Sequence, residues 1–121
     1  MGSLTGFTVV ELAGIGPAPM GGMILADMGA NVIRVDRPEA TDPKISEPIS
    51  GRGKKSVVLD LKQDASREAL FNLIESADAL IDPYRPGVCE KLGFGPKACL
   101  KRNEKLVFAR VTGWGQTGPL S

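Results

Sequence analysis

Basic side chains follow three of the apolar segments that the sequence predicts as strands. Arg37 follows a segment that ends at residue 35, Lys62 follows one that ends at residue 61, and Arg85 comes shortly after another. Arginine offers a planar fork that matches phosphate oxygens, and lysine offers a movable point charge. Lys91 lies a few residues further on, and Tyr84 supplies a flat ring for a base. These residue types predict binding of a ligand that carries several phosphate groups.

A glycine pattern after the first apolar segment suggests a different ligand. Gly14 and Gly16 precede a predicted helix, and Asp36 comes 36 − 16 = 20 residues after the second glycine. This spacing imitates the nicotinamide-dinucleotide fingerprint. However, Pro19 stands where the third glycine belongs, and Pro17 removes an N–H from the turn. A nicotinamide-dependent reductase is therefore the less favoured alternative.

Because the chain contains no histidine, acid–base chemistry would fall to carboxylates, Lys, Tyr or Cys, or to residues outside this chain. The absence of histidine excludes His-ligated metal sites and His general bases within these residues. Asp60 and Asp82 end predicted strands, where they either act on a substrate or accept backbone N–H bonds. Spacing does not separate these roles. The other carboxylates considered are Glu11, Asp27, which is expected to be structural, and Asp36.

The elements that must position these residues alternate between strands and helices. Strands are predicted over residues 7–12, 31–35, 56–61, 79–81 and 106–111. Helices are predicted to begin at Pro17, after a cap at Asp64, at Pro86 and at Pro96, and residues 38–55 form a long loop. This order predicts an α/β fold with a parallel sheet and helices on both faces. The polar clusters would then share the carboxyl edge of the sheet.

Two predicted helices carry apolar residues at helical spacing. In the first, Met20, Met23, Ile24 and Met28 repeat before Gly29 ends the helix. In the second, a buried stripe is predicted from residues 69, 70, 73, 74 and 77.

Composition predicts a single intracellular, cytoplasmic domain. The 121 residues are 42% apolar, which suits one domain. Lys and Arg number 15 against 14 Asp and Glu, so no global charge favours nucleic acid or an anionic membrane. No apolar run approaches the ~20 residues that span a bilayer. Cys89 and Cys99 are expected to be buried, reduced thiols.

Several segments together resemble the family III CoA-transferases, in the expected order and over nearly the whole chain. The motifs Glu-Leu-Ala-Gly-Ile-Gly-Pro and Arg-Val-Asp-Arg-Pro look most like the α-methylacyl-CoA racemase branch of that family. The matching segments are residues 9–19, 25–38, 56–62, 84–88, 90–93 and 110–119.

The resemblance implies a Rossmann-like fold that binds coenzyme A. Residues 1–121 would be the N-terminal, coenzyme A-binding part of the family's large domain, incomplete relative to the family. Coenzyme A is part of the substrate, so no metal or redox cofactor is expected. The positions that match coenzyme A-binding residues are Arg37, Leu59, Asp60, Leu61, Lys62, Pro83, Tyr84, Arg85 and Lys91.

The implied reaction is epimerisation of 2-methylacyl-CoA thioesters by removal and return of the α-proton. The family's His–Asp pair lies beyond the loop at Gly118 and Pro119, so we expect this chain to be a fragment that does not catalyse alone. We also expect an exposed apolar patch, a homodimer for the full-length protein, and a mitochondrial or peroxisomal location in a eukaryote. The alternatives are a family III CoA-transferase, whose Asp nucleophile would also lie downstream, and a non-catalytic CoA-binding module.

Overall fold

The fold is built around one parallel sheet of five strands. The computed structural model describes residues 2–40 and 49–121. All four strand pairings are parallel, and the strand order is β3-β2-β1-β4-β5. This is the order of the first five strands in doubly wound nucleotide-binding folds. The strands are β1 (Thr8–Leu12), β2 (Asn31–Asp36), β3 (Lys55–Val58), β4 (Ala79–Asp82) and β5 (Val107–Arg110).

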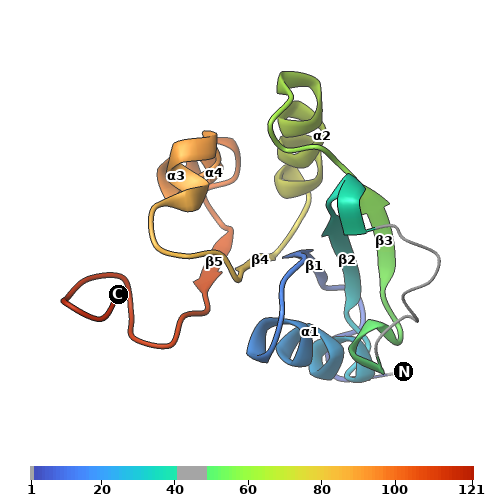
Figure 1. Ribbon diagram of the computed structural model, residues 1–121. Coiled ribbons are helices and arrows are strands. Elements are labelled where there is room, and N and C mark those ends of the chain that lie inside the picture. The colour runs from blue at the N-terminus through green and yellow to red at the C-terminus, as the bar shows by residue number, and fades with distance from the viewer. Residues whose placement is uncertain (1, 41–48) are drawn as a thin grey trace.

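Helices cover both faces of this sheet, as predicted. Figure 1 shows α1 on one face and α2, α3 and α4 on the other. The helices are α1 (Pro17–Asp27), α2 (Asp64–Glu75), α3 (Val88–Leu92) and α4 (Pro96–Arg102). Two short 3-10 helices, η1 (Pro38–Ala40) and η2 (Ile49–Gly51), lie within the predicted loop, whose residues 41–48 are outside the described part. No helix in the described ranges is long and apolar enough to cross a bilayer.

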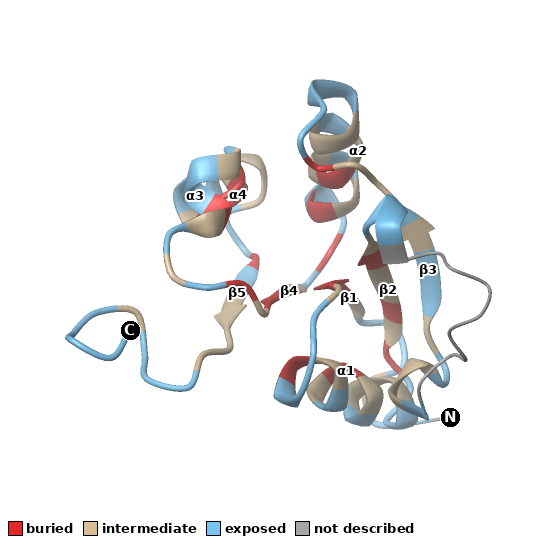
Figure 2. Cartoon of the chain, viewed as in Figure 1, coloured by how far each residue is buried: buried red, intermediate tan, exposed pale blue. Residues whose placement is uncertain are grey.

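The central strand β1 feeds two hydrophobic cores through its alternating side chains. Val10 and Leu12 belong to the larger core on the side of α2 and α4, and both are completely buried. Val9 belongs to the smaller core together with Ala18 of α1 and Val32 of β2. Figure 2 shows the buried residues along the sheet and on the inward sides of the helices. Because successive side chains of a strand point to opposite faces, one short strand anchors both layers.

The helix α1 has the predicted limits, and it packs its small residues against the sheet. Gly16, with a φ of 73°, precedes Pro17 at the start of α1. Its buried residues are the small ones, Ala18 and Gly22, whereas Met20 is 56% exposed and Ile24 is 44% exposed. The apolar spacing therefore identifies the helix, while Met20 and Ile24 remain exposed and Leu25 packs against the smaller core.

A buried ion pair explains why small residues face inward. Glu11 of β1 accepts a 2.7 Å hydrogen bond from the Nζ of Lys54, and that Nζ also donates to the Pro19 carbonyl at 2.9 Å. Both charged side chains are almost fully buried, and burial raises the pKa of Glu11 although Lys54 opposes this shift. A Cβ added at Gly22 would lie 1.7 Å from the Glu11 Oε1, so only glycine fits above the carboxylate.

Three predicted boundaries are wrong by a few residues. β3 ends at Val58 instead of residue 61, because the Asp60 carbonyl accepts the Gln63 N–H at 2.8 Å and the chain turns. Gln63, not Asp64, occupies the N-cap position of α2. The third helix begins at Val88 instead of residue 86, since Gly87 has a φ of 85° there.

The two cysteines are free and buried, as expected. Burial raises the pKa of the Cys99 thiol to about 11 and raises that of Cys89 further. The Cys99 thiol donates a 3.2 Å hydrogen bond to the Phe94 carbonyl. Both residues contribute to the larger core, so they act as small apolar side chains.

Candidate functional site

The carboxyl ends of the strands meet at one edge of the sheet, because all five strands are parallel. The strand order reverses between β1 and β4, which both leave this edge next to each other. Open α/β sheets bind ligands in the crevice at such a switch point. The predicted basic residues Arg37, Lys62 and Arg85 follow β2, β3 and β4, so the topology brings them to this same edge.

Arg37 and Tyr84 are the predicted pair that the structure places in direct contact. The Arg37 guanidinium lies over the Tyr84 ring, with its Cζ 5.0 Å from the ring centroid. Tyr84 is only 8% exposed, whereas Arg37 is exposed. Burial raises the pKa of the Tyr84 phenol, and the interaction with Arg37 opposes the shift. The stack joins the end of β2 to the end of β4 across β1.

The predicted segment at residues 59–62 divides into two kinds of residue. Leu61 is buried in the larger core, and the half-buried Leu59 packs against that core. Asp60 accepts the Lys62 N–H at 3.2 Å and shapes the turn. Lys62 is exposed. The cation at the end of this turn is thus available at the carboxyl edge.

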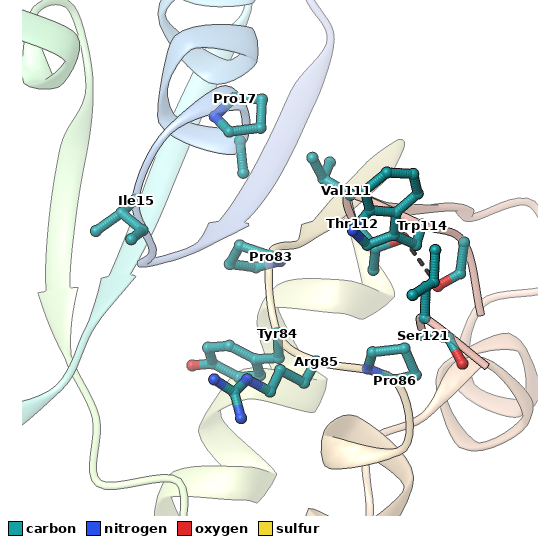
Figure 3. A pocket seen from close by; sticks show the side chains of 14 residues that line it. Ile15, Pro17, Pro83, Tyr84, Arg85, Pro86, Val111, Thr112, Trp114 and Ser121 are labelled. Carbon is teal, nitrogen blue, oxygen red and sulfur yellow. Dashed lines mark hydrogen bonds between the residues drawn. The ribbon is translucent and has the colours of Figure 1, made fainter. Parts of the chain in front are cut away.

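A pocket of about 710 Å³ lies at the switch point, and Figure 3 shows its lining. Pro83, Tyr84 and Arg85, the predicted segment after the fourth strand, line this pocket. Lys62, Lys91 and Arg37 lie outside the pocket lining. Arg37 stacks on Tyr84, which is a lining residue. The lining residues that follow β1 and β5, and that were missing from the predicted site, are Ile15, Pro17, Ala18, Val111, Thr112, Gly113, Trp114, Gly115, Leu120 and Ser121.

The lining combines one basic residue with several apolar ones. Arg85 is exposed beside the buried Tyr84 ring. Trp114 is 71% exposed and Ile15 is 91% exposed, and both are lining residues, from the loops after β5 and β1 respectively. The signal for these residues was present in the sequence as glycine-rich loops after the first and fifth strands. Such a lining suits a ligand with an anionic part and an apolar part.

The Gly14–Gly16 pattern has a packing explanation. A Cβ added at Gly14 would lie 2.6 Å from the Pro83 Cβ, so the loop after β1 can approach the loop after β4 only without a side chain. Gly16 adopts a φ of 73°, which favours glycine. Both glycines are thus accounted for by the shape of the pocket, without a bound dinucleotide.

The carboxylates near the site are engaged in structural contacts. Asp82 is 3% exposed and accepts the Tyr84 N–H at 2.8 Å. Asp60 accepts the Lys62 N–H, and Glu11 pairs with Lys54. The remaining two pair with arginines: Asp27 with Arg52 and Asp36 with Arg34. For Asp60 and Asp82, the structure therefore favours the backbone-binding role over acid–base chemistry.

The strand order and the helices on both faces define a doubly wound α/β protein with a parallel sheet. Residues 4–121 match CoA-transferase family III, and the chain belongs to this family. This membership gives no support to the nicotinamide-dependent reductase considered from the sequence.

Racemases and transferases of this family both resemble the chain. Human α-methylacyl-CoA racemase is 46% identical over 116 residues, covering 96% of this chain and 30% of that protein. Acetyl-CoA:oxalate CoA-transferase from Acetobacter aceti is 35% identical over 131 residues, covering 99% of this chain and 34% of that protein. The crystal structure of Rv3272 from Mycobacterium tuberculosis superposes with a TM-score of 0.91 at 36% identity, covering 99% of this chain and 35% of that one. The chain thus spans about a third of its relatives' length.

Proposed function

We propose that this chain is the coenzyme A-binding part of an α-methylacyl-CoA racemase. The observation that carries the proposal is the stack of Arg37 on Tyr84, because it joins two basic strand ends beside the pocket that Arg85 lines. Arg37, Lys62 and Arg85 would bind the phosphates, with Lys91 of α3 as a further cation. The apolar lining residues, Ile15 and Trp114 among them, would contact the less polar part of the thioester.

The racemase is preferred to a CoA-transferase because of the degree of similarity. The human racemase is 46% identical to the chain, and the mouse racemase is 47% identical. The acetyl-CoA:oxalate CoA-transferase is 35% identical. In the proposed reaction, a base removes the proton next to the thioester carbonyl, and an acid returns a proton to the opposite face. Glu11, Asp60 and Asp82 are engaged in structural contacts, so we assign this acid–base pair to residues outside the chain.

The direct test is calorimetric titration of coenzyme A into the chain. Arg85→Ala should weaken binding by about 1.5–3 kcal/mol, the contribution of one charge-assisted contact. Lys105→Ala is the matched control, since it removes one positive charge from an exposed residue just before β5, at the opposite edge of the sheet. Equal affinities of the Arg85 variant and the unchanged chain would remove Arg85 from the site. No binding by the unchanged chain would refute the proposal.

A second test addresses the placement of the catalytic pair. The chain is incubated with a 2-methylacyl-CoA in deuterated water, and loss of the α-proton is followed by NMR. We expect no exchange above the rate without protein. Measurable exchange would show that carboxylates of this chain suffice for proton removal.

A further inference from the structure

Arg110, the last residue of β5, contacts three segments around the pocket although it does not line the pocket itself. Its Nη1 donates a 2.6 Å hydrogen bond to Gln116 in the loop after β5. Its Nη2 donates to the Glu90 carboxylate of α3. Its Nε lies 3.8 Å from the Asp82 Oδ2 at the end of β4. One guanidinium therefore joins two neighbouring strand ends and a helix.

Asp82 connects this guanidinium to the residues that line the pocket. It pairs with Arg110 in the register of β4 and β5, and its carbonyl accepts the Val111 N–H at 2.9 Å. Beyond this point the two strands lead into separate walls of the pocket: the β4 wall at residues 83–86 and the β5 wall at residues 111–115, 120 and 121. The Asp82 Oδ1 accepts the Tyr84 N–H, while its Oδ2 faces Arg110. The carboxylate thus orients the β4 wall and meets the arginine that contacts the β5 wall.

Gln116 is the point at which the β5 wall is held. In the described part of the chain, the hydrogen bond from Arg110 is the one that joins residues 112–121 to the rest of the structure. The others are internal to the loop: Thr112 Oγ1 donates to the Gly115 carbonyl, and Ser121 donates to the Gly118 carbonyl. Loss of the bond between Arg110 and Gln116 would leave Trp114 and its neighbours without a hydrogen-bonded anchor.

A second arginine with similar surroundings shows what an ordinary structural role looks like. Arg102 stacks on Phe71 and donates hydrogen bonds to Glu68 and Glu75, its Nε included. Arg110 also lies over a phenylalanine, but its buried Nε has no hydrogen-bond partner. A buried donor without an acceptor costs free energy. The position of the Arg110 guanidinium therefore does not maximise its number of hydrogen bonds and needs another explanation. Reaching Gln116 and Glu90 at once accounts for the position of the guanidinium.

We propose that Arg110 is a positioning residue that sets the β4 wall against the β5 wall, so that both meet the same coenzyme A thioester. It acts through Asp82 and Gln116 and does not contact the ligand. This inference rests on the proposed function for the identity of the ligand. Its statement about the β5 wall can be tested without any ligand, because Trp114 is the single tryptophan of the chain and lies in that wall.

The first experiment changes Gln116, whose side chain accepts the hydrogen bond from Arg110 and which lies outside the pocket lining. Gln116→Leu has a similar size and no acceptor, whereas Gln116→Glu keeps an acceptor for the guanidinium. We expect Gln116→Leu to lower the fluorescence anisotropy of Trp114 and to weaken coenzyme A binding by about tenfold, as for coupled neighbouring residues. Gln116→Glu should retain the anisotropy and most of the affinity.

The second experiment compares the two arginines. Arg110→Gln should weaken coenzyme A binding by about tenfold and lower the Trp114 anisotropy. Arg110→Lys should restore the affinity and the anisotropy only in part, because one ammonium group cannot reach three segments. Arg102→Gln breaks ion pairs of the same kind between α2 and α4. It should lower the melting temperature and leave both readouts unchanged.

The outcomes separate the inference from the proposed function. If Arg85→Ala loses affinity while Gln116→Leu and Arg110→Gln bind coenzyme A normally with unchanged anisotropy, the positioning role of Arg110 is refuted. The same holds if Arg102→Gln alters both readouts as strongly, since the effect would then reflect general stability. If the unchanged chain does not bind coenzyme A, the proposed function fails, and the placement of the β5 wall is decided by the Trp114 anisotropy alone.

Discussion

The guanidinium of Arg37 covers the ring of Tyr84, 5.0 Å from its centroid, although the two residues lie on strand ends separated by β1. Arginine over an aromatic face gains from the negative charge density of the ring while it keeps its hydrogen-bond donors at the edge. Tyr84 itself belongs to the larger core and is 8% exposed. The aromatic ring and a basic side chain therefore form one surface at the carboxyl edge.

The burial of Tyr84 has a consequence for alkaline pH. Its phenol pKa lies above the ordinary value of 10.0 in the folded chain, because burial disfavours the phenolate. The stability that this group contributes is thus complete below pH 10.0 and is lost as the pH rises through the folded pKa. Tyr84 is the single tyrosine, so tyrosinate absorbance reports it alone. The folded chain should titrate at higher pH than the chain in denaturant, and coincident curves would contradict this prediction.

Two adjacent glycines of α1 should respond in opposite ways to alanine. A Cβ at Gly21 meets nothing within 4 Å, so Gly21→Ala should stabilise the chain by roughly 0.5–1 kcal/mol through helix propensity. A Cβ at Gly22 would collide with the Glu11 carboxylate, so Gly22→Ala should destabilise it by about 1–3 kcal/mol. Urea unfolding of both variants measures these values. Equal effects would mean that Glu11 does not occupy the space below α1.

The buried pair of Glu11 and Lys54 should show strong coupling. Lys54→Met removes the cation and leaves a buried carboxylate, which costs about 3–5 kcal/mol. Adding Glu11→Gln to that variant should recover much of the loss, because no unpaired charge remains. A double-mutant cycle by chemical denaturation gives the coupling free energy. Additive single effects would show that the two groups do not depend on each other.

The cysteines should resist modification in the folded chain. The pKa of Cys99 is raised to about 11 by burial, and that of Cys89 is also raised, so neither forms much thiolate at pH 8. Iodoacetamide at that pH should leave the native chain unlabelled, and mass spectrometry should find both cysteines modified in denaturant. Rapid labelling of one cysteine under native conditions would place it at an accessible surface.

Local signals were sufficient to predict the elements. The fourth helix runs from Pro96 to Arg102 as the sequence indicates, since a proline at its start is a signal within the element itself. The end of β3 was missed because the turn is made by Asp60, whose preference competes with strand extension without appearing in apolar spacing. The face that α1 packs on the sheet could not be predicted from the helix itself, because it depends on Lys54, which follows that helix by a long stretch of chain.

The candidate site could be predicted in its location and only partly in its members. Parallel strands place Arg37 and Arg85 at one edge whatever the strand order. Which residues share a pocket depends on β1 and β5 both lying beside β4, and that order is a tertiary property. Ile15 and Trp114 therefore entered the site only with the structure.

The ammonium of Lys54 donates hydrogen bonds both to Glu11, in the strand beneath α1, and to the carbonyl of Pro19 within α1. It consequently acts as a rotational stop for the helix. Turning α1 about its axis by about 100°, so that Met23 took the place of Gly22, would withdraw that carbonyl and bring a side chain over Glu11. Lys54 thus fixes the direction in which the exposed side chains of Met20 and Ile24 project. The orientation of the outer face of α1 is therefore determined by a residue outside this helix.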